Sequence, residues 1–199
     1  YYSDDIGKLS GDGTANLICK SEKITDGSPY SYRVVAEVTD ISNQRISTQN
    51  TVTVHPAQFY VGVKTPNSHS GFAKTKEKIT FPYILTDVNG NLLEKPELKV
   101  STIEYSLSRE EWTLIHEQSV DNTIYTRYER EDIEELKGTI DIKTSGNLEI
   151  TPQNSGWYTL TVNGFDNKGN KTTTTYEFYV TGGSSYRYNN YNSEAITLT

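Results

Sequence analysis

Two stretches of the chain, 29–54 and 155–180, repeat one pattern of residues at a constant offset. In each stretch an alternating run leads to an aspartate, passes through a polar turn and returns along a second run, and Asp166 follows Asp40 by 126 residues. Alternation with a period of two is typical of a half-buried strand, and an Asx-rich turn between two such runs predicts a β-hairpin. An internal repeat of this length indicates tandem copies of one β-rich module.

The rest of the chain has the same character. Tyrosine occurs 15 times, and tyrosine and threonine suit pleated, half-buried surfaces better than helices. Clusters of Gly, Asn, Asp and Pro separate the short alternating runs, as they do in an all-β sandwich. The charged cluster 129–137 is expected to be a solvated loop, with a helical turn as the alternative. We expect strands over 30–39, 47–54, 77–86, 98–107, 112–120, 123–131, 139–143, 157–166 and 172–180.

These patterns predict an all-β chain of tandem Ig- or fibronectin-like antiparallel β-sandwich domains. If the repeat marks a domain period, residues 1–57 are the C-terminal part of a first sandwich and 58–182 form a complete second one. Residues 183–199 then form a linker and the first strand of a following domain. The connection between the first two units is short, which favours a fixed geometry between them.

Charge and hydropathy exclude several partners. The chain has 19 Lys and Arg against 26 Asp and Glu, for a formal net charge of −7. A nucleic-acid binder or an anionic-membrane binder needs the opposite balance. Because no apolar run approaches the ~20 residues needed to cross a bilayer, we expect no direct membrane insertion by this chain.

The residues that could catalyse a reaction are few and scattered. Cys19 is the only cysteine, and its strand-like setting favours a small buried apolar residue over a nucleophile. The three histidines, His55, His69 and His116, lie in no recognisable nucleophile–base motif. Glu110 and its neighbour on the same strand point to opposite faces, so they cannot flank one sugar as glycosidase carboxylates do. We expect no enzymatic activity.

The stretch 87–91 begins like a calcium loop but lacks the closing glutamate, and its Asn-Gly pair is a strong hairpin-turn signal. No metal or other cofactor is therefore expected. The aromatic residues leave two alternatives open. Trp112 and the tyrosines of the C-terminal segment could stack on sugars, or they could pack as an amphipathic joint between modules. These tyrosines are Tyr186, Tyr188 and Tyr191.

Residues 30–44 look like the Tyr-x-Val-x-Ala-x-Val-Thr-Asp stretch of bacterial alpha-2-macroglobulins, and 51–63 is similar to that family's Phe-Tyr-x-Gly joint between consecutive domains. The later Gly-Trp-Tyr at 156–158 fits the closing strands of the next domain. The resemblance implies an extracytoplasmic protease trap, in the periplasm, at the cell surface or secreted, which offers a cleavable bait and changes conformation when cut. In such a protein this chain would be framework.

The resemblance also implies partners and joint residues. The partners would be neighbouring domains of the same parent chain, and proteases through the intact parent. The family's thioester sequence is Cys-x-Glu-Gln, which the segment 19–22 does not match, and we expect the bait and the thioester beyond Thr199. The rival interpretation is an Ig-like adhesin module or a carbohydrate-binding accessory module. The residues expected at the joints are His55, Pro56, Phe59, Tyr60, Tyr186, Tyr188 and Tyr191.

Overall fold

The computed structural model describes residues 6–16, 18, 20–66, 72–93, 102–118 and 124–182. These parts of the chain form ten strands and no helix. The strands are β1 (Tyr30–Thr39), β2 (Arg45–Val54), β3 (Phe59–Val63), β4 (Phe72–Lys74), β5 (Ile79–Asp87), β6 (Thr102–Gln118), β7 (Ile124–Asp141), β8 (Ser145–Ile150), β9 (Gly156–Phe165) and β10 (Lys171–Thr181).

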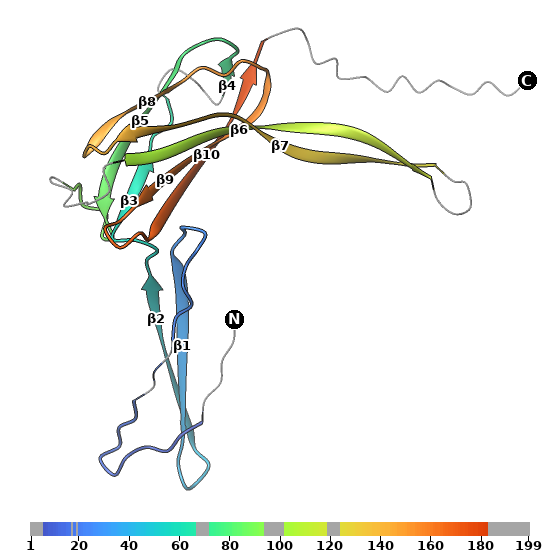
Figure 1. Ribbon diagram of the computed structural model, residues 1–199. Coiled ribbons are helices and arrows are strands. Elements are labelled where there is room, and N and C mark those ends of the chain that lie inside the picture. Colours follow the sequence, from blue (N-terminus) through green and yellow to red (C-terminus); the bar gives the residue numbers. More distant parts are fainter. Residues whose placement is uncertain are drawn as a thin grey trace, which may run out of the picture.

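Eight of the strands build two sheets that face each other, with β6 and β7 running on beyond them (Figure 1). The larger sheet has the order β4-β10-β9-β6-β7, and the smaller has the order β3-β5-β8. All neighbouring strands run antiparallel except β4, which pairs with β10 in parallel. The chain is therefore an all-β sandwich, as the alternating runs predict.

The core lies between the two sheets and follows from the alternation within each strand. On β9, Tyr158, Leu160 and Val162 point inward and are buried, while Trp157 points outward. Each large apolar side chain that is fully buried contributes about 1.5–3 kcal/mol relative to exposure. The buried apolar residues of the smaller sheet are Phe59, Val61, Ile79, Phe81, Tyr83, Leu85, Leu148 and Ile150.

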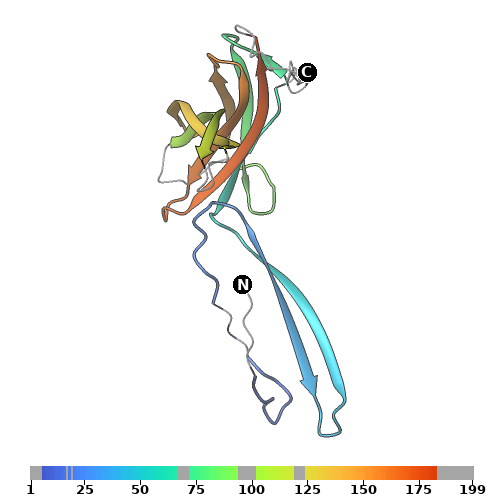
Figure 2. The ribbon, with the colours of Figure 1, turned by 90° about the vertical axis from the view of Figure 1, so that its right-hand side faces the viewer.

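Strands β1 and β2 form a separate two-stranded hairpin that extends away from the sandwich (Figure 2). Shifting their bounds by the repeat offset reproduces those of β9 and β10, apart from one extra residue at the end of β10. The register is also shared, because Thr39 pairs with Arg45 as Phe165 pairs with Lys171. The internal repeat is thus a repeat of structure.

Three hairpin turns share one hydrogen-bonding pattern that begins at an aspartate. In the turns of Asp40, Asp87 and Asp166, the Oδ1 atom accepts the backbone N–H groups two and four residues later. The fourth residue of each turn, with the aspartate counted as the first, has a positive φ. This residue is Asn43, Gly90 or Gly169. The turn geometry accounts for the polar residues of 87–91 without a cation.

The charged cluster at 129–137 is strand, so the expectation of a loop there is wrong. Strand β7 runs through it and pairs with β6 over its whole length, and β6 is one strand where two were expected. A two-stranded ribbon exposed on both faces carries no burial pattern, so its sequence does not resemble that of a half-buried strand. The short strands β3, β4 and β8 were also not among the expected ones.

Several expectations fall outside the described residues. These concern Cys19, His69, Tyr186, Tyr188 and Tyr191.

Candidate functional site

The sequence predicts a joint at the residues between β2 and β3, and several polar contacts hold these residues in place. Pro56 and Ala57 are buried, while His55 is exposed. The Nδ1 atom of His55 lies 2.7 Å from the hydroxyl oxygen of Tyr60, and the two rings meet edge to face with centroids 5.8 Å apart. Two of the predicted joint residues, His55 and Tyr60, therefore contact each other directly across the start of β3.

The turn between β9 and β10 closes over this connection. The Asp166 side chain is fully buried and accepts backbone N–H groups from Lys168, Asn170 and Gln58. Burial raises the pKa of Asp166, but the hydrogen bonds from Asn170, Lys168 and Gln58 outweigh it and hold the pKa below its usual value. The carboxylate thus stays charged and ties Gln58, which lies between β2 and β3, to the turn.

A second attachment lies in front of β1, at Gly27, which sequence reasoning missed. The Thr173 N–H donates to the Gly27 carbonyl oxygen at 3.0 Å, which joins the base of the hairpin to β10. Gly27 is buried and has a φ of +83°, and a Cβ atom there would lie 2.8 Å from the Thr173 nitrogen. The Asp-Gly-Ser-Pro turn at 26–29 was the available signal. The hairpin is therefore attached to the sandwich through both of its strands, at its open end.

Phe59, which the sequence predicts at the joint, is a core residue of the sandwich. It is 1% exposed and lies in the core of the sandwich, where its ring packs over Gly164. Tyr60 is its neighbour on the strand and points the other way, half-buried beside His55. The Phe-Tyr pair therefore divides between the core and the joint.

A second polar cluster lies at the root of the β6–β7 ribbon, which is the part of the two strands beyond the register shift, 108–118 and 124–134. The register between the two strands shifts between Leu107 and Ser108, which leaves Glu135 as the extra residue of a β-bulge. Its carboxylate accepts hydrogen bonds from Arg109 Nε at 2.7 Å, Tyr158 Oη at 2.7 Å and Asn154 Nδ2 at 2.8 Å. The bulge turns Glu135 inward, to where these donors meet it.

Burial and hydrogen bonding act in opposite directions on this cluster. Burial raises the pKa of Glu135, but the hydrogen bonds from Tyr158, Asn154 and Arg109 lower it further than burial raises it. Burial and the bond to Glu135 together raise the pKa of Tyr158 strongly. The charged Glu135 and its three hydrogen-bond donors thus anchor the ribbon to the sandwich.

Neither histidine within the described residues lies in a catalytic arrangement. His55 belongs to the joint, and His116 lies on β6, 3.4 Å from the Thr126 hydroxyl on the partner strand. Among the residues that the structure describes, no three His, Cys, Asp or Glu side chains are grouped to hold a metal ion. Within the same residues there is no helix long and apolar enough to cross a bilayer.

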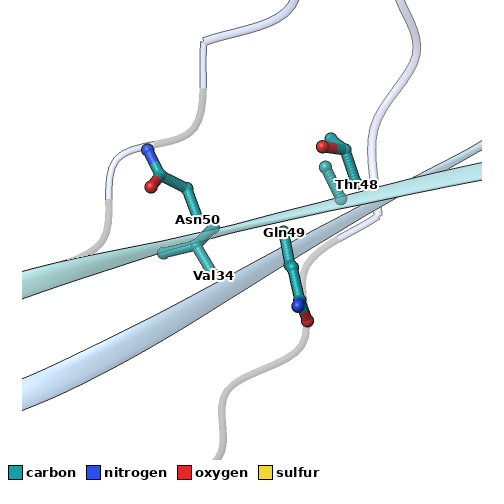
Figure 3. Close-up of a pocket in the computed structure, with 5 residues that line it drawn as sticks. Val34, Thr48, Gln49 and Asn50 are labelled. Carbon is teal, nitrogen blue, oxygen red and sulfur yellow. The ribbon is translucent and has the colours of Figure 1, made fainter.

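A shallow hollow of about 340 Å³ lies along the β1–β2 hairpin (Figure 3). Its lining includes Val34, Ala36 and Asn50, and Figure 3 shows Asn50 and Thr48 on one side of the ribbon with Gln49 on the other. The repeat offset maps Val34 onto the buried Leu160 and Ala36 onto the buried Val162. The hollow therefore lies on the side of the hairpin that corresponds to a core face.

The fold is that of a β-sandwich with a hairpin attached to it, and comparison with known families shows where it belongs. The model of bacterial macroglobulin domain 6 matches residues 62–182, and the chain belongs to this family. The chain is 26% identical over 159 residues to an alpha-2-macroglobulin homolog of Nostoc sp. (strain PCC 7120 / SAG 25.82 / UTEX 2576), an alignment covering 79% of the chain and 8% of that protein.

Two solved structures are also similar to the chain. Salmonella alpha-2-macroglobulin reacted with methylamine matches with a TM-score of 0.49 and 15% identity, over 77% of this chain and 10% of that one. The native conformation of E. coli alpha-2-macroglobulin matches with a TM-score of 0.47 and 16% identity, over 78% of this chain and 10% of that one. The chain thus spans about a tenth or less of the length of these proteins.

Proposed function

We propose that this chain is a framework segment of an alpha-2-macroglobulin-like protease inhibitor, in which it holds neighbouring domains at a defined angle. The observation that carries the proposal is the double attachment of the β1–β2 hairpin to the sandwich. One attachment is the Gly27–Thr173 hydrogen bond, and the other is the His55–Tyr60 contact beside the buried Pro56. Two separated attachments restrain a hinge more strongly than one connecting strand does.

The proposal includes the domain division expected from the sequence. Residues 1–57 belong to a preceding sandwich, and 58–182 are a complete one. The inward side of β9 and β10 is buried, while its equivalent on the hairpin leaves Ile46 and Val52 exposed. That difference supports the assignment of the hairpin to another sandwich, and residues 183–199 would then connect to a following domain.

In this proposal the chain has no catalytic role and works outside the cytoplasm. Its partners are the adjoining domains of its parent, and proteases meet it only through the intact parent. The substitution Gly27→Ala tests the joint, because it places a side chain against Thr173 and strains a positive φ. Gly90→Ala is the matched control, since Gly90 has a φ of +87° in an exposed turn with open space around it.

Small-angle scattering of the 199-residue chain is the direct measurement. Gly27→Ala is expected to broaden the distribution of distances between hairpin and sandwich, while the melting temperature stays close to that of Gly90→Ala. In the parent protein, Gly27→Ala should reduce the amount of protease that co-elutes after cleavage, and Gly90→Ala should not. Identical scattering profiles for the two variants would contradict a restrained joint.

A further inference from the structure

Both tryptophans of the chain lie exposed on the outward face of the larger sheet. Trp157 on β9 and Trp112 on β6 are 53% and 55% exposed, although burial is the usual fate of large aromatic side chains. Trp157 pairs across the strands with Tyr179, with ring centroids 5.3 Å apart. Extending the β6–β9 register places Glu110 beside Trp157, and Glu110 accepts a hydrogen bond from Trp112 Nε1 at 3.3 Å.

This surface continues along the ribbon that extends from the sandwich (Figure 1). Leu114 pairs with Tyr128, and Gln118 pairs with Ile124, so these side chains lie on the same face as Trp112. Leu114, Tyr128 and Ile124 are all exposed. We call this surface the aromatic face, and it consists of Trp112, Leu114, Ile124, Tyr128, Arg130, Trp157 and Tyr179.

The reverse face of the ribbon has a different chemistry. Four of the eight residues in register there are acidic, with Glu111 opposite Glu131 and Glu129 opposite Thr113. Arg127 on that face is already paired with Glu117 at 2.8 Å. The ribbon is therefore amphipathic, with an apolar, aromatic side and an anionic side, although the described residues cover neither side.

The root of the ribbon is fixed before any partner binds. Glu135 at the bulge holds Arg109 and Tyr158, and both of these lie on the inward side of the sheet. On the outward side, Arg130 forms ion pairs with Glu110 at 3.1 Å and Asp132 at 3.0 Å. A surface held in place in this way loses little conformational entropy when it docks.

We propose that the aromatic face is a docking surface for another domain of the parent chain. Exposed tryptophan, tyrosine and arginine close together are the residue types that dominate protein–protein contacts. The matching part of the Nostoc relative is 8% of that protein, so nearly all of the surface available to cover this face lies elsewhere in such a parent. The proposal rests on the framework role, and it adds a contact far along the chain from the joint.

The geometry favours a protein over a glycan as the occupant. The planes of Trp157 and Tyr179 meet at 63°, so the two rings do not offer the single flat platform on which a sugar would stack. Trp112 is also committed through its indole N–H to Glu110. A partner with side chains can fill the angle between such rings.

Photo-crosslinking in the full-length parent tests the proposal. A benzoylphenylalanine is placed at Tyr128 on the aromatic face or, as the matched control, at Tyr125 on the reverse face of the same strand. The two tyrosines are 56% and 57% exposed in this chain. We expect position 128, and not position 125, to give an intramolecular crosslink to a distant segment of the same monomer. The backbone amide hydrogens of 124–130 should also exchange with solvent at least about ten times more slowly in the parent than in the 199-residue chain.

Each other outcome overturns the proposal. A crosslink between two parent molecules would make a second copy the occupant, and no crosslink with unchanged exchange would leave the face in solvent. Crosslinking from both positions would deny the difference between the faces. If a glycan protected Tyr128 in the 199-residue chain, the occupant of the aromatic face would be a sugar and not a domain. Since the joint is tested with Gly27, a failure of docking is distinguishable from a failure of the framework role.

Discussion

Replacing Glu135 by glutamine is expected to lower the free energy of unfolding of the sandwich substantially, although the change in side-chain size is small. The substitution keeps the shape of the side chain but removes the charge that Arg109 faces at 2.7 Å. The Arg109 and Glu135 side chains are only 10% and 13% exposed, so water replaces little of the lost interaction. Arg109 would retain only Glu111, at 3.6 Å.

The magnitude follows from the number of hydrogen bonds involved. Glu135 accepts three, and bonds to a charged group contribute about 1.5–3 kcal/mol each in favourable settings. Glutamine retains one acceptor oxygen, so part of this network survives. Removing one partner of a fully buried pair costs about 3–5 kcal/mol, and the residual exposure reduces that figure here. We expect a loss of about 2–3 kcal/mol, or roughly 5–10 °C in melting temperature.

The assay is urea unfolding of wild type and Glu135→Gln at a series of pH values. Because the folded-state pKa of Glu135 is lowered, its charge stabilises the fold above the unfolded pKa, and this contribution is lost as pH falls through the folded pKa. The difference between the two proteins should therefore be constant near neutrality and shrink below about pH 4.3.

Glu134→Gln provides the control, because Glu134 is the exposed neighbour that pairs with Ser108 and does not enter the bulge. Its unfolding free energy should stay within about 0.5 kcal/mol of wild type. If the two variants lose equal stability, or if the Glu135→Gln difference persists unchanged in acid, the anchoring role assigned to the bulge is refuted.

Two further substitutions test the packing near the joint. Asp166→Asn should cost about 2 kcal/mol of unfolding free energy in thermal or urea denaturation, because Asp166 is buried and its charge accepts three backbone N–H groups; Asp87→Asn, in an exposed turn of the same geometry, should cost less than half of that. Gly164→Ala should cost about 1–3 kcal/mol, since its Cβ would lie 2.8 Å from the ring of Phe59; a wild-type melting temperature would show that the ring moves freely.

The parts of the fold that the sequence predicts are those with a local signal. The hairpins at 30–54 and 156–181 follow from alternation and from an aspartate that organises the turn by itself. Strand β8 and the ribbon have weaker signals, because β8 is short and the ribbon is exposed on both faces. A bulge leaves no mark in one sequence, so the inward turn of Glu135 was not predictable.

The residues near the joint were also predictable only where the signal lies in neighbouring residues. His55 and Pro56 follow directly from the end of a strand, and in the structure both lie between β2 and β3. Phe59 and Tyr60 are adjacent, so alternation puts one in the core and one outside, but the sequence does not say which. Gly27 was missed because its partner, Thr173, lies in the other copy of the repeat.

The bulge at Glu135 lies at the root of the ribbon, so a small rotation there produces a larger displacement at the far end. Beyond it, β6 continues from Ser108 to Gln118, a stretch that spans about 35 Å at ordinary strand rise. A tilt of about 10° at the root would carry the far end through about 6 Å, which is more than the spacing of adjacent strands in a sheet. A tilt of this size at the Glu135 bulge would shift the distal part of the aromatic face by more than one strand spacing, and a force on that end would act back on the Arg109–Glu135 ion pair.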